Sequence, residues 1–123
     1  MKLIRFIVGR IILLLDFLTR PSSVIRSRED QDSVDAAVIG LSLYQFKACP
    51  FCVKVRRHMR RRSIKIELKD AKTDLLIKEE LIREGGKHKV PCLRIAEDNK
   101  EVQWLYSSDE ICRFLDAKLD QLK

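Results

Sequence analysis

The 123-residue sequence has no long hydrophobic run. In its apolar first 20 residues, the longest stretch without a charge is the five residues from Ile11 to Leu15. A bilayer-spanning helix needs about 20 apolar residues. A secretory signal would need a cleavage site of small residues, and none follows. Both absences argue against a spanning helix or a signal peptide. A short span is still compatible with the sequence if the side chains of Arg5 and Arg10 snorkel to the membrane interface.

Cysteine is also scarce. The chain has four cysteines, and only Cys49 and Cys52 form a CxxC pair. Four unevenly spaced cysteines do not make the disulfide framework of a small secreted protein, which predicts a reducing compartment, the cytoplasm. A structural zinc site needs about four ligands, usually from two pairs. The remaining thiols and imidazoles show no such second pair; they are Cys92, Cys112, His58 and His88.

Acidic residues are rare in the middle of the chain. The formal net charge is +7, and residues 36–70 hold nine Lys/Arg against two Asp/Glu. Aromatic residues do not interleave with these charges and no nucleic-acid recognition motif is present, so we expect no nucleic-acid partner. The basic segment is either a solvated helix face or a face that attracts anionic thiol substrates or lipid headgroups.

The CxxC pair lies where a strand gives way to a helix. Residues 41–46 alternate apolar and polar side chains as a half-buried strand does, and residues 53–62 lack Gly and Pro. Pro50 suits the first helical position. Cys49 would then lie at the helix N-terminus, which favours its thiolate, while Cys52 packs one turn further in. This arrangement predicts a redox pair; a zinc half-site and two inert cysteines are the alternatives.

Residues 1–20 read as a basic amphipathic helix. One face is apolar and the opposite face carries Lys2, Arg5, Gly9, Asp16 and Arg20. The apolar face consists of Ile4, Ile7, Val8, Ile11, Leu14, Leu15 and Leu18. The pattern is typical of a helix lying in a membrane interface. The alternatives are a transmembrane or signal anchor, and packing on the protein's own sheet or on a second subunit.

The domain organisation follows from these segments. We expect a membrane-associating helix at 1–20, a linker with a short helix at 21–40 and one domain at 41–123. Basic residues after the first helix place that domain on the cytoplasmic side, peripheral on or anchored to the inner face of the membrane.

The remaining periodicity predicts three more strands and two more helices. We expect strands at 63–69, 90–96 and 101–106, and helices at 75–84 and from Ser107 or Ser108 onward. The helix-length connection makes the first two strands parallel, and a turn at 98–100 makes the last two an antiparallel hairpin. This order is a thioredoxin-like α/β fold: a four-stranded mixed sheet flanked by helices, with an added N-terminal amphipathic helix.

Three motifs together resemble the glutaredoxin family over roughly residues 41–122. They are Cys49-Pro50-Phe51-Cys52 after the first strand, Val90-Pro91 at the third strand and Ser108-Asp109 at the last helix. Val90-Pro91-Cys92-Leu93 and residues 105–111 are also similar to the N-terminal domain of glutathione S-transferases.

The resemblance implies a glutathione site with a role for each motif. It implies a cis Val90–Pro91 bond, with the Val90 main chain pairing with the cysteine of glutathione. The Ser108 N–H would bind the glutamyl carboxylate and Asp109 the adjacent amine. Lys47 would bind the glycyl carboxylate, and Phe51 would supply a ring wall.

We therefore expect a glutathione-dependent thiol–disulfide oxidoreductase near a membrane surface. Its partners would be glutathione as reducing co-substrate, glutathionylated or disulfide-containing proteins, and an anionic membrane surface. Catalysis would use Cys49 and Cys52, without a metal. A non-catalytic adaptor that binds glutathione or an iron–sulfur cluster is the competing hypothesis. A glutathione transferase is a third, weakened because the second, helical domain of those enzymes is missing.

Overall fold

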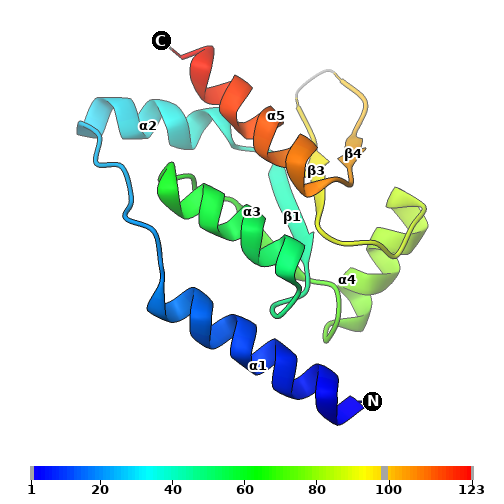
Figure 1. Cartoon of the computed structure of the whole chain (residues 1–123). Coiled ribbons are helices and arrows are strands. Elements are labelled where there is room, and N and C mark those ends of the chain that lie inside the picture. Colours follow the sequence, from blue (N-terminus) through cyan, green and yellow to red (C-terminus); the bar gives the residue numbers. More distant parts are fainter. Residues whose placement is uncertain (1, 98–99, 123) are drawn as a thin grey trace.

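The computed structural model describes residues 2–97 and 100–122 of the chain (Figure 1). Its strands are β1 (Leu41–Gln45), β2 (Glu67–Asp70), β3 (Cys92–Ile95) and β4 (Gln103–Leu105). Its helices are α1 (Lys2–Leu18), α2 (Arg28–Ala37), α3 (Pro50–Arg61), α4 (Leu75–Glu80), the π-helical turn η1 (Leu81–Gly85) and α5 (Ser108–Asp120). The turn expected at 98–100 includes residues 98–99, which lie outside the described residues.

The four strands form one mixed sheet in the order β2-β1-β3-β4. β1 pairs parallel with β2, because α3 carries the chain back to the starting end of the sheet. β3 pairs antiparallel with both β1 and β4. The predicted parallel pair, the predicted hairpin and the predicted thioredoxin-like fold are thus confirmed.

Neighbouring residues of β1 face opposite layers, as the pleat of a strand requires. Leu43 lies in the larger apolar core, which also holds side chains from α2, α3 and α5. Tyr44 lies on the other face with Leu81 of η1 and Cys92 of β3. The side chains of Leu43 and Tyr44 are both fully buried, so β1 lies at the centre of the fold.

Most predicted elements have shorter or shifted bounds in the structure; the strands predicted at 90–96 and 101–106 are Cys92–Ile95 and Gln103–Leu105. The second strand begins at Glu67, which pairs with Ser42 near the start of β1, instead of at residue 63, where Ser63 has a φ of 52°. Ile64 and Ile66 are still buried in the core. The alternation of apolar and polar residues before Glu67 therefore reflects which side chains are buried, although these residues do not pair with a strand. The helix predicted at 75–84 is α4 continued by η1, and it ends at Gly86 with a φ of 85°.

The segment at 21–40 contains the ten-residue helix α2. Ser27 caps it, accepting a hydrogen bond from the Asp30 N–H at 3.2 Å. Val34 and Val38 are buried in the larger core, so this part of the chain packs on the domain. α1 lies alongside α3 and joins α2 through an extended segment (Figure 1). No helix within residues 2–97 and 100–122 is long and apolar enough to cross a membrane.

Candidate active site

Cys49 sits at the start of α3, immediately after the turn that leaves β1. It is the N-cap residue of this helix, with φ −73° and ψ 127°, and Pro50 follows at the first helical position. The Cys49 N–H donates to Phe46 O at 3.3 Å, and Cys49 O accepts from the Val53 N–H at 2.9 Å. The side chain therefore projects from the N-terminal end of a helix, as the sequence predicts.

The two cysteines of the motif have different surroundings. Cys49 is partly exposed, whereas Cys52 is 0% exposed. Burial raises the pKa of Cys52 to about 12, although the Phe46 N–H, which donates to its sulfur at 3.4 Å, acts in the opposite direction. Cys52 therefore stays a thiol at neutral pH, and Cys49 is the sulfur that a substrate can reach. The predicted burial of Cys52 is confirmed.

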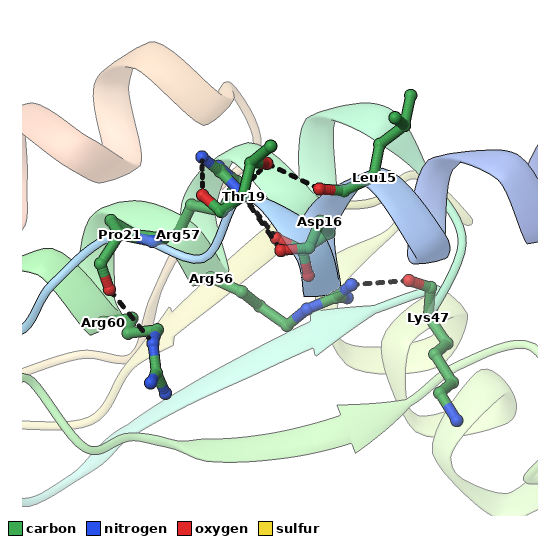
Figure 2. Close-up of polar contacts among 8 residues, drawn as sticks. All are labelled: Leu15, Asp16, Thr19, Pro21, Lys47, Arg56, Arg57 and Arg60. Carbon is green, nitrogen blue, oxygen red and sulfur yellow. Dashed lines mark hydrogen bonds and ion pairs between the residues drawn. The ribbon is translucent and has the colours of Figure 1, made fainter.

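Arg56 of α3 holds the turn in front of Cys49 in place. Its Nη2 donates to Lys47 O at 2.6 Å (Figure 2). Its Nη1 donates to Phe46 O at 3.4 Å and to the Gln45 side chain. Two of these acceptors are backbone carbonyls, so the guanidinium fixes the course of the loop. This role could not be predicted, since Arg56 is one of several cations in a basic run.

The Val90–Pro91 peptide bond is cis, as the resemblance implies. Cys92 of β3 is level with Tyr44 of β1, and Gln45 is the last residue of β1. The Val90–Pro91 bond therefore lies at the end of the sheet where the Cys49 turn begins. Pro91 is buried and Val90 partly buried. Cys92 is fully buried, and burial raises its pKa to about 11.

The start of α5 is held against α3. Ser107 is the N-cap residue, and Ser108 is 8% exposed. Asp109 forms an exposed ion pair with Lys54 of α3, and this pair holds the pKa of Asp109 below its ordinary value. The carboxylate expected to meet the amine of glutathione is thus charged and already has a cation beside it. Sequence reasoning did not identify Lys54, which lies 55 residues away.

The glutaredoxin family model matches residues 41–100. This segment is a glutaredoxin domain. The match contains Cys49, Cys52 and the Val90–Pro91 bond. Ser108 and Asp109 lie beyond it, as do α1 and α2. No curated protein and no solved structure matches the chain.

Two further site candidates of the glutaredoxin domain are exposed. The Phe51 ring is 62% exposed beside the two cysteines of α3, and Lys47 projects from the loop before Cys49. Within the part of the chain that the structure describes, Lys47 forms no ion pair. Both side chains are therefore available to a ligand.

α1 meets the glutaredoxin domain at the loop before Cys49, and it does so through its polar face. Gly9 is the only buried residue of α1, and a methyl group there would lie 3.1 Å from the Ala48 side chain. The apolar residues predicted for α1 lie on a different side of the helix from Gly9. Their side chains are all exposed, by between 47% and 66%. These residues, Ile4, Ile7, Val8, Ile11, Leu14, Leu15 and Leu18, are hereafter the outer face of α1.

Proposed function

We propose that this chain is a glutathione-dependent thiol–disulfide oxidoreductase that reduces mixed disulfides between glutathione and proteins. The observation that carries the proposal is the contrast between a partly exposed Cys49 at the N-terminus of α3 and a fully buried Cys52 within the same glutaredoxin domain. A helix N-terminus favours a thiolate, and the thiolate is the nucleophile in disulfide exchange.

The first step is an exchange at the glutathione sulfur. The Cys49 thiolate attacks that sulfur, a bond forms between the two, and the substrate protein leaves as its thiolate. A second glutathione thiolate then attacks the glutathione sulfur on Cys49, releasing Cys49 and oxidised glutathione. Each exchange conserves electrons, so one protein mixed disulfide and one reduced glutathione become one protein thiol and one glutathione disulfide.

Cys52 provides a second route from the same intermediate, the mixed disulfide between Cys49 and glutathione. Its sulfur can attack Cys49 and expel glutathione, leaving a Cys49–Cys52 disulfide that two glutathione molecules reduce. The attacking thiol must first lose its proton, and burial raises the pKa of Cys52 to about 12. The exchange with a second glutathione is therefore the faster route for glutathionylated substrates.

The glutathione in this proposal spans three parts of the site. The main chain of Val90 pairs with its cysteine, and Ser108 at the start of α5 binds the glutamyl carboxylate. Asp109 takes the amine in place of Lys54, and Lys47 takes the glycyl carboxylate. Phe51 covers the tripeptide as a ring wall. The exposure of Lys47 and Phe51 and the helix N-terminus at Ser108 support these roles.

We further propose that the enzyme works at the cytoplasmic surface of a membrane, with α1 lying in the interface. The outer face of α1 is apolar and exposed, while its polar face packs on the domain. Lys2, Arg5, Arg10 and Arg20 make α1 basic as well as amphipathic, and such helices are attracted to anionic headgroups.

Turnover of a glutathionylated peptide tests the catalytic proposal. We expect Cys49→Ser to abolish turnover and Cys52→Ser to retain it. Undiminished turnover by Cys49→Ser would contradict the proposal. Visible absorbance in protein purified without oxygen would instead support the iron–sulfur adaptor.

A further inference from the structure

A basic groove separates α1 from the glutaredoxin domain. Its volume is about 680 Å³, and both sides of it carry cations. Lys2, Arg5 and Arg10 come from α1, whereas Lys47 and Lys72 come from loops of the domain. We call the space lined by these five residues the basic groove.

The basic groove borders the cavity that holds the reactive sulfur. A second cavity of about 320 Å³ is lined by Cys49 and Pro50, and it shares Arg5, Ala48 and Lys72 with the basic groove. The two cavities thus flank the contact between Gly9 and Ala48, and together they lead from Cys49 along α1.

The five cations of the basic groove exceed the negative charge in its lining, which comes from Asp70. None of its five cations forms an ion pair within residues 2–97 and 100–122. The one carboxylate in the lining belongs to Asp70, and its two oxygens accept hydrogen bonds from Lys72 N, Thr73 N and Thr73 Oγ1 at 2.6–3.1 Å. Cations in excess of the negative charge around them attract an anionic ligand.

We propose that the basic groove binds an acidic segment of the glutathionylated substrate protein, adjacent to its modified cysteine. The proposal rests on the proposed exchange at Cys49 and adds the class of protein that is accepted. A mixed disulfide brings the substrate chain close to Cys49, in the second cavity, which shares lining residues with the basic groove. Several cations spread over two walls fit an extended chain with several carboxylates better than a single anion. The apolar side chains of Phe6 and Leu13 in the same lining suit the aliphatic parts of such a chain.

α1 is the specificity element in this proposal. Three of the five cations lie on it, outside residues 41–100 that match the family model. These cations line the basic groove, whereas Ile4 and Val8 of the outer face line the second cavity beside Cys49.

The test uses the full chain and three glutathione mixed disulfides. One is the mixed disulfide with β-mercaptoethanol, and the others are two peptides of equal length whose cysteine is flanked by Glu and Asp or by Gln and Asn. We expect the wild type to favour the acidic peptide in kcat/KM by roughly tenfold at low salt, and the preference to shrink as salt screens the charges.

The test variant is Arg5→Gln/Lys72→Gln, which removes one cation from each wall and leaves Lys47 in place. We expect it to lose the preference for the acidic peptide and to reduce the β-mercaptoethanol substrate as the wild type does. The control variant, Arg28→Gln/Lys65→Gln, makes the same charge change at two exposed positions away from the basic groove, and it should keep the preference.

The outcomes separate this inference from the proposed function. If the wild type fails to reduce the β-mercaptoethanol substrate, the proposed function fails, and this inference fails with it. If that substrate turns over but the two peptides have equal kcat/KM, the inference alone is overturned. If the two peptides have equal kcat/KM and Arg5→Gln/Lys72→Gln binds phosphatidylglycerol vesicles more weakly than the wild type, the inference is overturned in favour of a headgroup site.

Discussion

Arg57 of α3 lies with its Nη1 3.1 Å from Oδ1 of Asp16 in α1 (Figure 2). The same guanidinium donates to the backbone carbonyl of Thr19 at 2.8 Å through Nη2. Arg56 holds the loop before Cys49 and Arg57 holds α1, so two consecutive residues of α3 fix the two structures on either side of the Gly9 contact. The position of α1 is thereby coupled to the helix that carries Cys49.

Asp16→Asn should loosen α1. The variant loses the charge of a partly buried ion pair, which is worth about 1 kcal/mol. A loss of this size corresponds to roughly fivefold faster amide exchange when α1 opens locally. Hydrogen exchange followed by mass spectrometry on peptides from residues 2–18 measures the effect. Asp32→Asn in α2, at an exposed carboxylate, is the control. Equal exchange rates in wild type and Asp16→Asn would contradict this role of the pair.

The buried Cys52 thiol should make stability depend on pH. Its pKa is raised from the ordinary 9.0 to about 12, mainly by burial. A thiol whose pKa is raised by folding stabilises the fold fully below pH 9, and this contribution is lost as pH rises toward 12. We compare the free energies of unfolding of Cys49→Ser and Cys49→Ser/Cys52→Ala between pH 8.5 and 10.5. Above pH 9, the variant that retains Cys52 should lose about 1.4 kcal/mol more per pH unit. A pH-independent difference would show that Cys52 is not protected by burial.

The ion pair between Lys54 and Asp109 predicts that substitutions of its two residues have different effects on the KM for glutathione. Asp109→Asn should raise the KM for glutathione roughly tenfold, because a charge-assisted hydrogen bond to the amine is lost. Lys54→Gln should not raise it, because it removes the cation that competes with that amine. Glu110→Gln, at the next residue of α5, is the matched control. Steady-state kinetics at a fixed disulfide concentration give the KM values. Equal values for Asp109→Asn and Glu110→Gln would remove Asp109 from the glutathione site.

The outer face of α1 predicts binding to lipid vesicles. Ile7→Ser/Ile11→Ser/Leu14→Ser should weaken co-sedimentation with vesicles containing phosphatidylglycerol by roughly a hundredfold, since three apolar side chains no longer leave water. Ile25→Ser/Ile39→Ser/Leu122→Ser changes the same residue types at exposed positions elsewhere and should bind as the wild type does. If the wild-type chain stays in the supernatant, or if both variants lose binding equally, the membrane proposal fails.

Local patterns were sufficient to predict the centre of the fold. The alternation of residues 41–46 predicts β1, and the lack of Gly and Pro after Cys52 predicts α3, because both are set by neighbours in the chain. The alternation of residues 63–69 predicts burial correctly but places the start of the strand four residues early. Hydrophobic alternation reports which side chains are buried, whereas strand pairing depends on the backbone, which here pairs with β1 from Glu67 onward.

The packing around the site could not be predicted from the sequence in the same way. The amphipathic pattern of α1 identifies an apolar face, yet the domain binds the opposite face through Gly9 and Asp16. Asp16 and Arg57 are 41 residues apart, and Lys54 and Asp109 are 55 apart. Each pair joins two of many charged side chains, and only the tertiary structure selects the partners.

The most direct test of the account is to locate the glutathionyl group. Cys52→Ser is incubated with oxidised glutathione, digested without reductant and examined by mass spectrometry. The account predicts one glutathionyl group, on Cys49, which reduced glutathione removes. An unmodified protein, or a modification confined to Cys92 or Cys112, would contradict the assignment of Cys49 as the nucleophile.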